Sequence, residues 1–226
     1  MGRPKKPPHS QKAIVVRFTI LSNAPWANSG YGNQTKLLAP RFKKLGHEVS
    51  IVAYYGHQGA PMDWEGCHLY GVAQDPFGMD AVAAYATDFG SDFVLTNMDI
   101  WVIKPELFMD KKWVAWIPVD SEPIPPLVEE NARKAFHRII WTKSAAKEMD
   151  DAGLDYDRVP YGIDTKNFFP GDKEKARATA QMPQDKFIVG MVAMNKGYPC
   201  RKAFFENIAA FKQFHDKHPD TYLYLH

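Results

Sequence analysis

Short runs of β-branched and apolar residues alternate along the chain with stretches whose apolar residues recur at helical spacing. The first run, residues 13–21, reads AIVVRFTIL, and after a Gly-containing loop residues 34–45 carry an apolar helical face. Gly46 ends this predicted helix, and residues 47–56, HEVSIVAYYG, form a second apolar run. Buried parallel strands are almost continuously apolar, and the order strand, Gly-containing loop, helix, strand predicts a βαβ unit.

The same alternation continues to residue 161. It predicts helices over 81–89, 127–136 and 145–152, and strands over 93–97, 113–118, 138–142 and 158–161. Ser144 is expected to cap the helix that follows it. Strands that alternate with helices in this way indicate an α/β fold, with an open, mostly parallel, Rossmann-like sheet covered by helices on both faces.

The pattern restarts after Pro170. A charged helix is expected over 172–180, a buried strand over 187–193, an amphipathic helix over 203–217 and a strand over 222–225. A lone βαβ fragment cannot bury both faces of its sheet. We therefore expect an N-terminal lobe over 13–170, and over 171–226 the first βαβ unit of an incomplete, truncated second lobe. Residues 1–12, which are Pro-rich and basic, are expected to be a disordered tail.

Composition narrows the possible partners. The net charge is +2, which gives no global electrostatic case for binding nucleic acid or an anionic membrane. GRPKK in the tail resembles half of an AT-hook, so a DNA-directed modifier stays open as a weak alternative. Two distant cysteines set no disulfide framework and favour a reduced, cytoplasmic setting. No apolar run approaches the roughly 20 residues that span a bilayer.

The first loop carries the sequence Ser-Gly-Tyr-Gly-Asn over residues 29–33. Backbone N–H groups at the start of a helix suit a phosphate or a sugar hydroxyl, which makes Gly30 and Gly32 candidates. The dinucleotide fingerprint is not met, because Thr35 replaces its third glycine and no acid follows the second strand. A glycine turn without a ligand is the alternative.

Two carboxylates follow predicted strand ends. Asp99 and Asp120 lie just past the strands over 93–97 and 113–118, at the edge of the sheet where ligands bind. A carboxylate there can orient a hydroxyl or take its proton, and Asp120 is the catalytic candidate. Alternatively, Asp99 caps the next turn and Asp120 stabilises a Pro-rich loop. Trp26 and Tyr31 can stack on a sugar ring, or they cover the first loop.

A basic turn precedes the helix over 203–217. Lys196, Arg201 and Lys202 surround a Gly-Tyr-Pro sequence there. Three cations at a helix N-terminus form an anion site, which would stabilise a leaving diphosphate without a metal. A solvated basic loop is the alternative. The sequence has no H-E-x-x-H or cysteine cluster that would indicate a metal site.

Three segments, in this order, resemble the retaining GT-B glycosyltransferases of the glycogen-synthase-like family 4 group. Residues 22–56 resemble the opening βαβ unit of these enzymes. Residues 159–172, VPYGIDTKNFFPGD, are similar to the interlobe signature V-P-x-G-I-D-x-x-x-F-x-P, a hinge between lobes. Residues 189–211 are similar to the start of the donor lobe, where an apolar strand leads to a basic pair and a helix.

The resemblance implies transfer of a sugar, with retention, from a nucleotide-diphosphate sugar to a glycan, lipid-linked or other hydroxyl acceptor. The first lobe would hold the acceptor, with Asp99, Trp26 and Tyr31 as binding candidates. Matching positions for the donor phosphates are Gly30, Gly32, Arg201 and Lys202, with Lys196 as a possible substitute for an unmatched family arginine. No metal or cofactor beyond the donor substrate is implied.

Some features of the family are not matched. Tyr161 replaces the usual Asn of the interlobe signature, and the family's cleft His has no clear counterpart. The E-x7-E motif that contacts the donor sugar would lie beyond His226. We therefore expect this chain to be inactive or weak alone. The alternative is a non-enzymatic glycan- or partner-binding protein derived from such a lobe.

Overall fold

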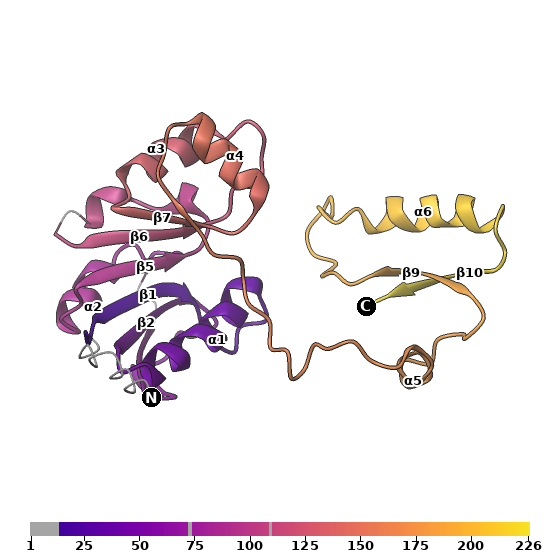
Figure 1. Cartoon of the computed structure of the whole chain (residues 1–226), viewed down its shortest axis with the longest axis horizontal. Coiled ribbons are helices and arrows are strands. Elements are labelled where there is room, and N and C mark those ends of the chain that lie inside the picture. Colours follow the sequence, from indigo (N-terminus) through magenta and orange to yellow (C-terminus); the bar gives the residue numbers. More distant parts are fainter. Residues whose placement is uncertain (1–13, 72–73, 109) are drawn as a thin grey trace, which may run out of the picture. The chain divides into compact units, whose positions relative to one another are not determined.

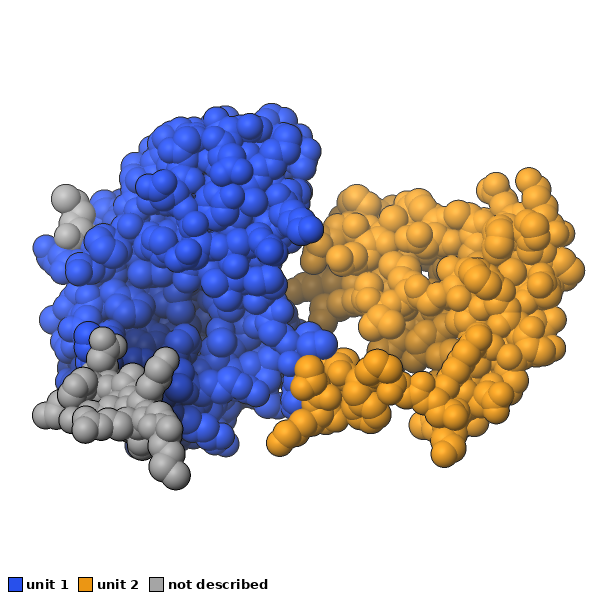
Figure 2. Space-filling model, viewed as in Figure 1, with its two compact units in different colours: residues 1–164 blue, residues 165–226 orange. Residues whose placement is uncertain are grey.

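The computed structural model describes residues 14–71, 74–108 and 110–226, so the predicted tail over 1–12 lies outside the described residues. The chain forms two compact units, which Figure 2 shows in different colours. The first unit ends at Asp164 and the second begins at Thr165. This boundary falls inside the VPYGIDTKNFFPGD segment.

The first unit is an α/β lobe around one eight-stranded sheet (Figure 1), with the strand order β3-β4-β2-β1-β5-β6-β7-β8. Every neighbouring pair is parallel except β3 and β4. Its elements are β1 (Arg17–Asn23), α1 (Gly30–Lys44), β2 (Glu48–Tyr55), β3 (Met62–Trp64), β4 (Cys67–Gly71), α2 (Val82–Asp88), β5 (Phe93–Asn97), η1 (Ile100–Val102), η2 (Pro105–Phe108), β6 (Lys112–Ile117), α3 (Pro126–Lys134), β7 (His137–Ile140), α4 (Lys143–Asp151) and β8 (Asp157–Arg158).

Each face of this sheet buries its own apolar cluster. Alternate strand residues point to opposite faces, so Ile20 and Ile51 join Ala39 of α1 in one cluster. On the other face Leu21 and Val52 join residues of α2, α3 and α4. The sheet is therefore covered on both sides, as its apolar strands predicted.

Three local predictions differ from the structure. The helix α1 begins at Gly30 rather than at residue 34, so the glycines lie in its first turn. Thr142, not Ser144, caps α4, because the Thr142 side chain accepts the N–H of Ala145. The β3–β4 hairpin was not predicted; it turns through Glu65 and Gly66, which both have positive φ.

The second unit contains α5 (Lys173–Thr179), β9 (Phe187–Met191), α6 (Phe204–His215) and β10 (Thr221–Leu225). Strands β9 and β10 pair in parallel, and with α6 they form the predicted βαβ unit. The expectation of a buried strand over 187–193 is wrong, because no residue of β9 is buried and Phe187 is 62% exposed. Only Phe204 and Thr221 are buried in this unit.

Among the described residues, no helix is both long enough and apolar enough to cross a bilayer.

Candidate functional site at the carboxyl edge of the sheet

Tyr31 and Asp99, two predicted acceptor-binding residues, form a hydrogen-bonded pair. Tyr31 lies in the first turn of α1, which follows β1, and Asp99 follows the adjacent strand β5. The Tyr31 hydroxyl donates to Asp99 Oδ1 over 2.8 Å. Because β1 and β5 are parallel neighbours, their carboxyl ends bring these distant residues together.

The pair carries a negative electrostatic environment. Burial, and then the charge of Asp99, raises the pKa of Tyr31 far above its ordinary value. Tyr54, at the end of β2, and Asp120, after β6, raise it further. Tyr31 therefore stays a neutral hydrogen-bond donor, and the charge of the exposed Asp120 carboxylate is the weakest of these causes. Asp99 occupies the N-cap position of η1, as the alternative expected, but its side chain makes no capping hydrogen bond and accepts the Tyr31 hydroxyl instead.

Asn97, the last residue of β5, connects this pair to other parts of the lobe. Its Nδ2 lies 3.2 Å from the Oγ of Ser22 and 3.4 Å from the carbonyl oxygen of Tyr31. Its Oδ1 accepts a short hydrogen bond from the hydroxyl of Tyr161. Asn97 is only 2% exposed, so it serves as a buried support and not as a ligand-binding group.

Aromatic rings surround the same edge. The Tyr161 ring lies 4.0 Å from that of Trp141 and 4.8 Å from that of Trp116, centroid to centroid. Trp141 also meets Tyr31 edge-to-face at 6.2 Å. The buried Nε1 of Trp141 has no hydrogen-bond partner in the described part of the chain. The site is thus a polar pair supported by aromatic rings, a composition that suits a hydroxyl-rich ring.

Trp26, the third acceptor candidate, makes separate contacts. Its Nε1 donates to the carbonyl oxygen of Gly56 over 2.6 Å, and its ring meets that of His57 edge-to-face. Trp26 is 47% exposed. The ring is therefore accessible, but it is held by the loop after β2 and not by the Tyr31–Asp99 pair.

The two glycines of the first turn differ in their surroundings. A Cβ at Gly32 would lie 2.5 Å from the carbonyl oxygen of Ala27, whereas one at Gly30 would meet nothing within 4 Å. The N–H of Gly32 already donates to the Oγ of Ser29, the α1 cap. Gly32 is therefore required by the packing of its own loop. The donor-phosphate role of both glycines stays a prediction.

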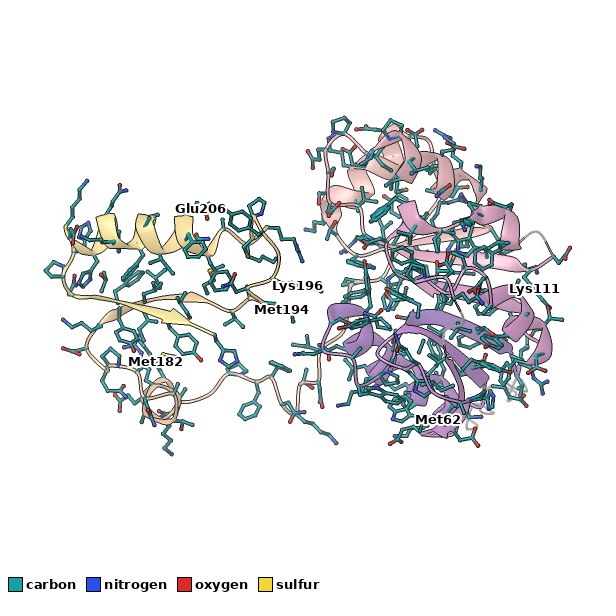
Figure 3. The ribbon with its side chains drawn as sticks, turned by 180° about the vertical axis from the view of Figure 1, so that it is seen from behind. Met62, Lys111, Met182, Met194, Lys196 and Glu206 are labelled. Carbon is teal, nitrogen blue, oxygen red and sulfur yellow. The ribbon has the colours of Figure 1, made fainter. Side chains whose placement is uncertain are left out.

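The predicted basic turn belongs to the second unit. Lys196, Arg201 and Lys202 are exposed in the segment between β9 and α6, where Figure 3 labels Lys196. The backbone N–H of Lys202 is the main cause of a lowered pKa at the Cys200 thiol, with weaker contributions from neighbouring N–H groups. Ala203, before α6, supplies no side-chain cap. The turn therefore combines exposed cations with backbone donors, which suits an anion.

Sequence reasoning missed four supporting residues: Gln34, Asn97, Trp141 and Tyr54. Three of them occur at or just after a strand's carboxyl end, in β5, β7 and β2. That position was the available signal, since it had already identified Asp99 and Asp120. Gln34 had no such signal, because its partner Gly162 is 128 residues away.

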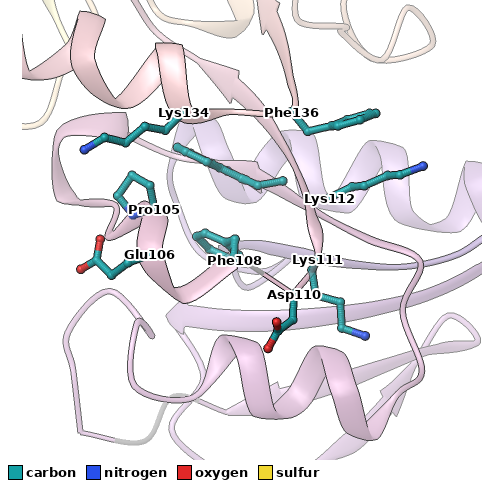
Figure 4. Close-up of a pocket in the computed structure, with 9 residues that line it drawn as sticks. Pro105, Glu106, Phe108, Asp110, Lys111, Lys112, Lys134 and Phe136 are labelled. Atoms are coloured by element: carbon teal, nitrogen blue, oxygen red, sulfur yellow. The ribbon is translucent and has the colours of Figure 1, made fainter.

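A separate pocket of about 720 Å³ opens beside the start of β6 (Figure 4), at the other end of the strand from Asp120. It is lined by Pro105, Glu106, Phe108, Asp110, Lys111, Lys112, Trp113, Lys134 and Phe136. None of these was a predicted site residue. Within the described ranges, no group of three His, Cys, Asp or Glu side chains could hold a metal ion.

Comparison with known proteins places the fold. No protein-family model and no curated protein sequence matches the chain. A sucrose-phosphate synthase from Thermosynechococcus elongatus is similar in structure, with a TM-score of 0.69 and 16% identity over 93% of this chain and 62% of that one. A glycosyltransferase from Rickettsia africae has a TM-score of 0.53 and 17% identity over 87% and 58%.

These similarities confirm the predicted fold, a Rossmann-like α/β lobe of the GT-B kind. At such identities they establish the fold alone. The chain spans about three fifths of the length of each of these two structures.

Proposed function

We propose that the chain belongs to a glycosyltransferase and that its first unit holds the acceptor. The observation that carries this proposal is the Tyr31–Asp99 pair at the carboxyl edge, with Asp120 following β6, the parallel neighbour of the strand before Asp99. A neutral tyrosine hydroxyl and two carboxylates can hydrogen-bond to the hydroxyls of a polyol and orient them. A phosphate-binding site, by contrast, is typically lined by cations. The two structural neighbours, one named a sucrose-phosphate synthase and the other a glycosyltransferase, support it.

In this proposal each unit has its own chemical task. The acceptor hydroxyl oxygen forms the bond to the anomeric carbon of a nucleotide-diphosphate sugar, and the bond from that carbon to the diphosphate breaks. Asp120 orients the attacking hydroxyl or accepts its proton. Lys196, Arg201 and Lys202 stabilise the leaving diphosphate, so that no metal is needed. The proposal includes retention of the anomeric configuration because the sequence resembles the retaining GT-B group.

The test is a panel of nucleotide sugars and hydroxyl acceptors, with the glycosylated product detected by mass spectrometry. Replacing both Arg201 and Lys202 by Ala should lower turnover by about a hundredfold or more, because two charge-assisted contacts to the leaving group are lost. Lys173→Ala with Lys217→Ala is the control, since it removes the same charge from exposed positions of the second unit.

Undiminished turnover in the Arg201/Lys202 variant, with normal product, would contradict the assigned roles. If the full-length protein binds a glycan but forms no glycosylated product with any donor, the non-enzymatic binding protein is favoured instead.

A further inference from the structure

The segment that leads out of the first unit is held at several points. The N–H of Val159 donates to the carbonyl oxygen of Ile140 over 2.9 Å, and its own carbonyl accepts the Trp116 Nε1 over 3.2 Å. Two residues later, the Tyr161 hydroxyl donates to Asn97. The chain is thus fixed along the edge of the sheet before it reaches Gly162.

Gln34 holds both polar backbone groups of Gly162. Its Nε2 donates to the Gly162 carbonyl oxygen over 2.9 Å, and its Oε1 accepts the Gly162 N–H over 3.1 Å. Gln34 is 5% exposed whereas Gly162 is exposed, so both bonds are partly buried. A two-point contact of this kind fixes the orientation of the peptide as well as its position.

The helix that carries Gln34 also carries half of the polar pair. Tyr31 lies one helical turn before Gln34 in α1. The hydroxyl of Thr35, the residue after Gln34, has two acceptors within reach: the carbonyl oxygen of Tyr31 at 3.0 Å and the Oγ of Ser22 at 2.9 Å. Asn97 contacts the Tyr31 carbonyl on one side and the Tyr161 hydroxyl on the other. The first turns of α1 therefore join the Tyr31–Asp99 pair to the segment at Gly162.

We propose that Gln34 is a positioning residue: it fixes the backbone at Gly162, where the chain approaches the end of the first unit at Asp164, relative to the Tyr31–Asp99 pair. The consequence for catalysis rests on the proposed function. There, Gln34 keeps the first turns of α1, which carry Tyr31, in the arrangement that orients the bound acceptor for attack. Loss of Gln34 therefore lowers kcat and leaves the acceptor KM unchanged.

Hydrogen exchange at the Gly162 amide, measured in the full chain, tests the positioning itself. Gln34→Met keeps the length of the side chain and removes both bonds, so the Gly162 protection factor should fall by about tenfold or more. In Gln34→Glu the ionised carboxylate still accepts the Gly162 N–H but cannot donate to the Gly162 carbonyl oxygen, which it now faces with its negative charge. Below the pKa of the introduced carboxyl, the protonated group can make both bonds, so the Gly162 protection factor should rise.

Asn33→Asp is the matched control, because it makes the same amide-to-acid change at an exposed neighbour in the same turn of α1. It should leave Gly162 protected at every pH. An unchanged protection factor in Gln34→Met overturns the inference. So does a Gly162 protection factor in Gln34→Glu that is the same above and below the pKa of the introduced carboxyl, which also decides the matter if the Met variant does not fold.

Measuring kcat and the acceptor KM of the wild type and of Gln34→Met distinguishes a failure of this inference from a failure of the proposed function. Loss of Gly162 protection in a protein whose wild type transfers no sugar leaves the positioning role standing and removes the proposed function. An active wild type whose Gln34→Met variant keeps its kcat overturns the catalytic consequence of Gln34.

Discussion

Gly32 and Gly30 lie two residues apart in one helical turn, yet only Gly32 has backbone oxygens where a Cβ would stand. Gly32→Ala should lower the free energy of unfolding by about 1–3 kcal/mol, since overpacking against backbone cannot be relieved by a rotamer change. Gly30→Ala, the control, should stay within about 1 kcal/mol of wild type. Urea unfolding measures both. Equal effects would show that the Ala27 contact does not constrain this turn.

The two cysteines differ in environment and should differ in reactivity. Burial raises the pKa of Cys67 to about 11, whereas the Lys202 N–H holds the pKa of Cys200 below its ordinary value. The thiolate is the reactive form and grows as pH rises through the pKa, so Cys200 should react at lower pH than an ordinary thiol. Peptide mapping after iodoacetamide labelling over a pH series measures this. Earlier labelling of Cys67 would contradict it.

At the scale of elements, the cap of α4 offers a direct test. Thr142→Ala removes the side-chain oxygen that accepts the Ala145 N–H, at 3.0 Å, and should cost about 1 kcal/mol of stability. Ser144→Ala, the control, changes a hydroxyl inside the helix and should cost less. Thermal unfolding of the two variants compares them. A larger loss in Ser144→Ala would restore the cap that the sequence pattern had suggested.

Most elements could be predicted because their apolar residues recur at helical or strand spacing over several turns. The β3–β4 hairpin could not, since Met62–Trp64 is a three-residue strand without a buried residue. In the site, Asp99 was singled out because it follows the end of a predicted strand, and Tyr31 because it is an aromatic residue of the first loop. Gln34 was not, because its hydrogen bonds to Gly162 join segments distant in the chain and leave no local pattern. Asn97 was missed although it ends a strand.

At the scale of the whole molecule, the two units differ in how well their strands are buried. Ile20 and Ile51, in β1 and β2, are 2% and 0% exposed, whereas no residue of β9 is buried. Amide protection reports the free energy of local opening, so β9 and β10 should exchange faster than β1 and β2. Hydrogen-exchange mass spectrometry on the full chain tests this. Equal protection would show that the second unit is stabilised by more than its own buried surface.

The central claim is sugar transfer to an acceptor held at the carboxyl edge. Its most direct test is the rate of nucleotide diphosphate release against acceptor concentration, for wild type and Asp120→Asn. We predict saturable, acceptor-dependent release in the wild type, and a kcat lower by about a hundredfold in the variant, which keeps the shape but loses the basic carboxylate. A rate of nucleotide diphosphate release that does not depend on acceptor concentration, or an Asp120→Asn kcat equal to that of the wild type, would contradict the account.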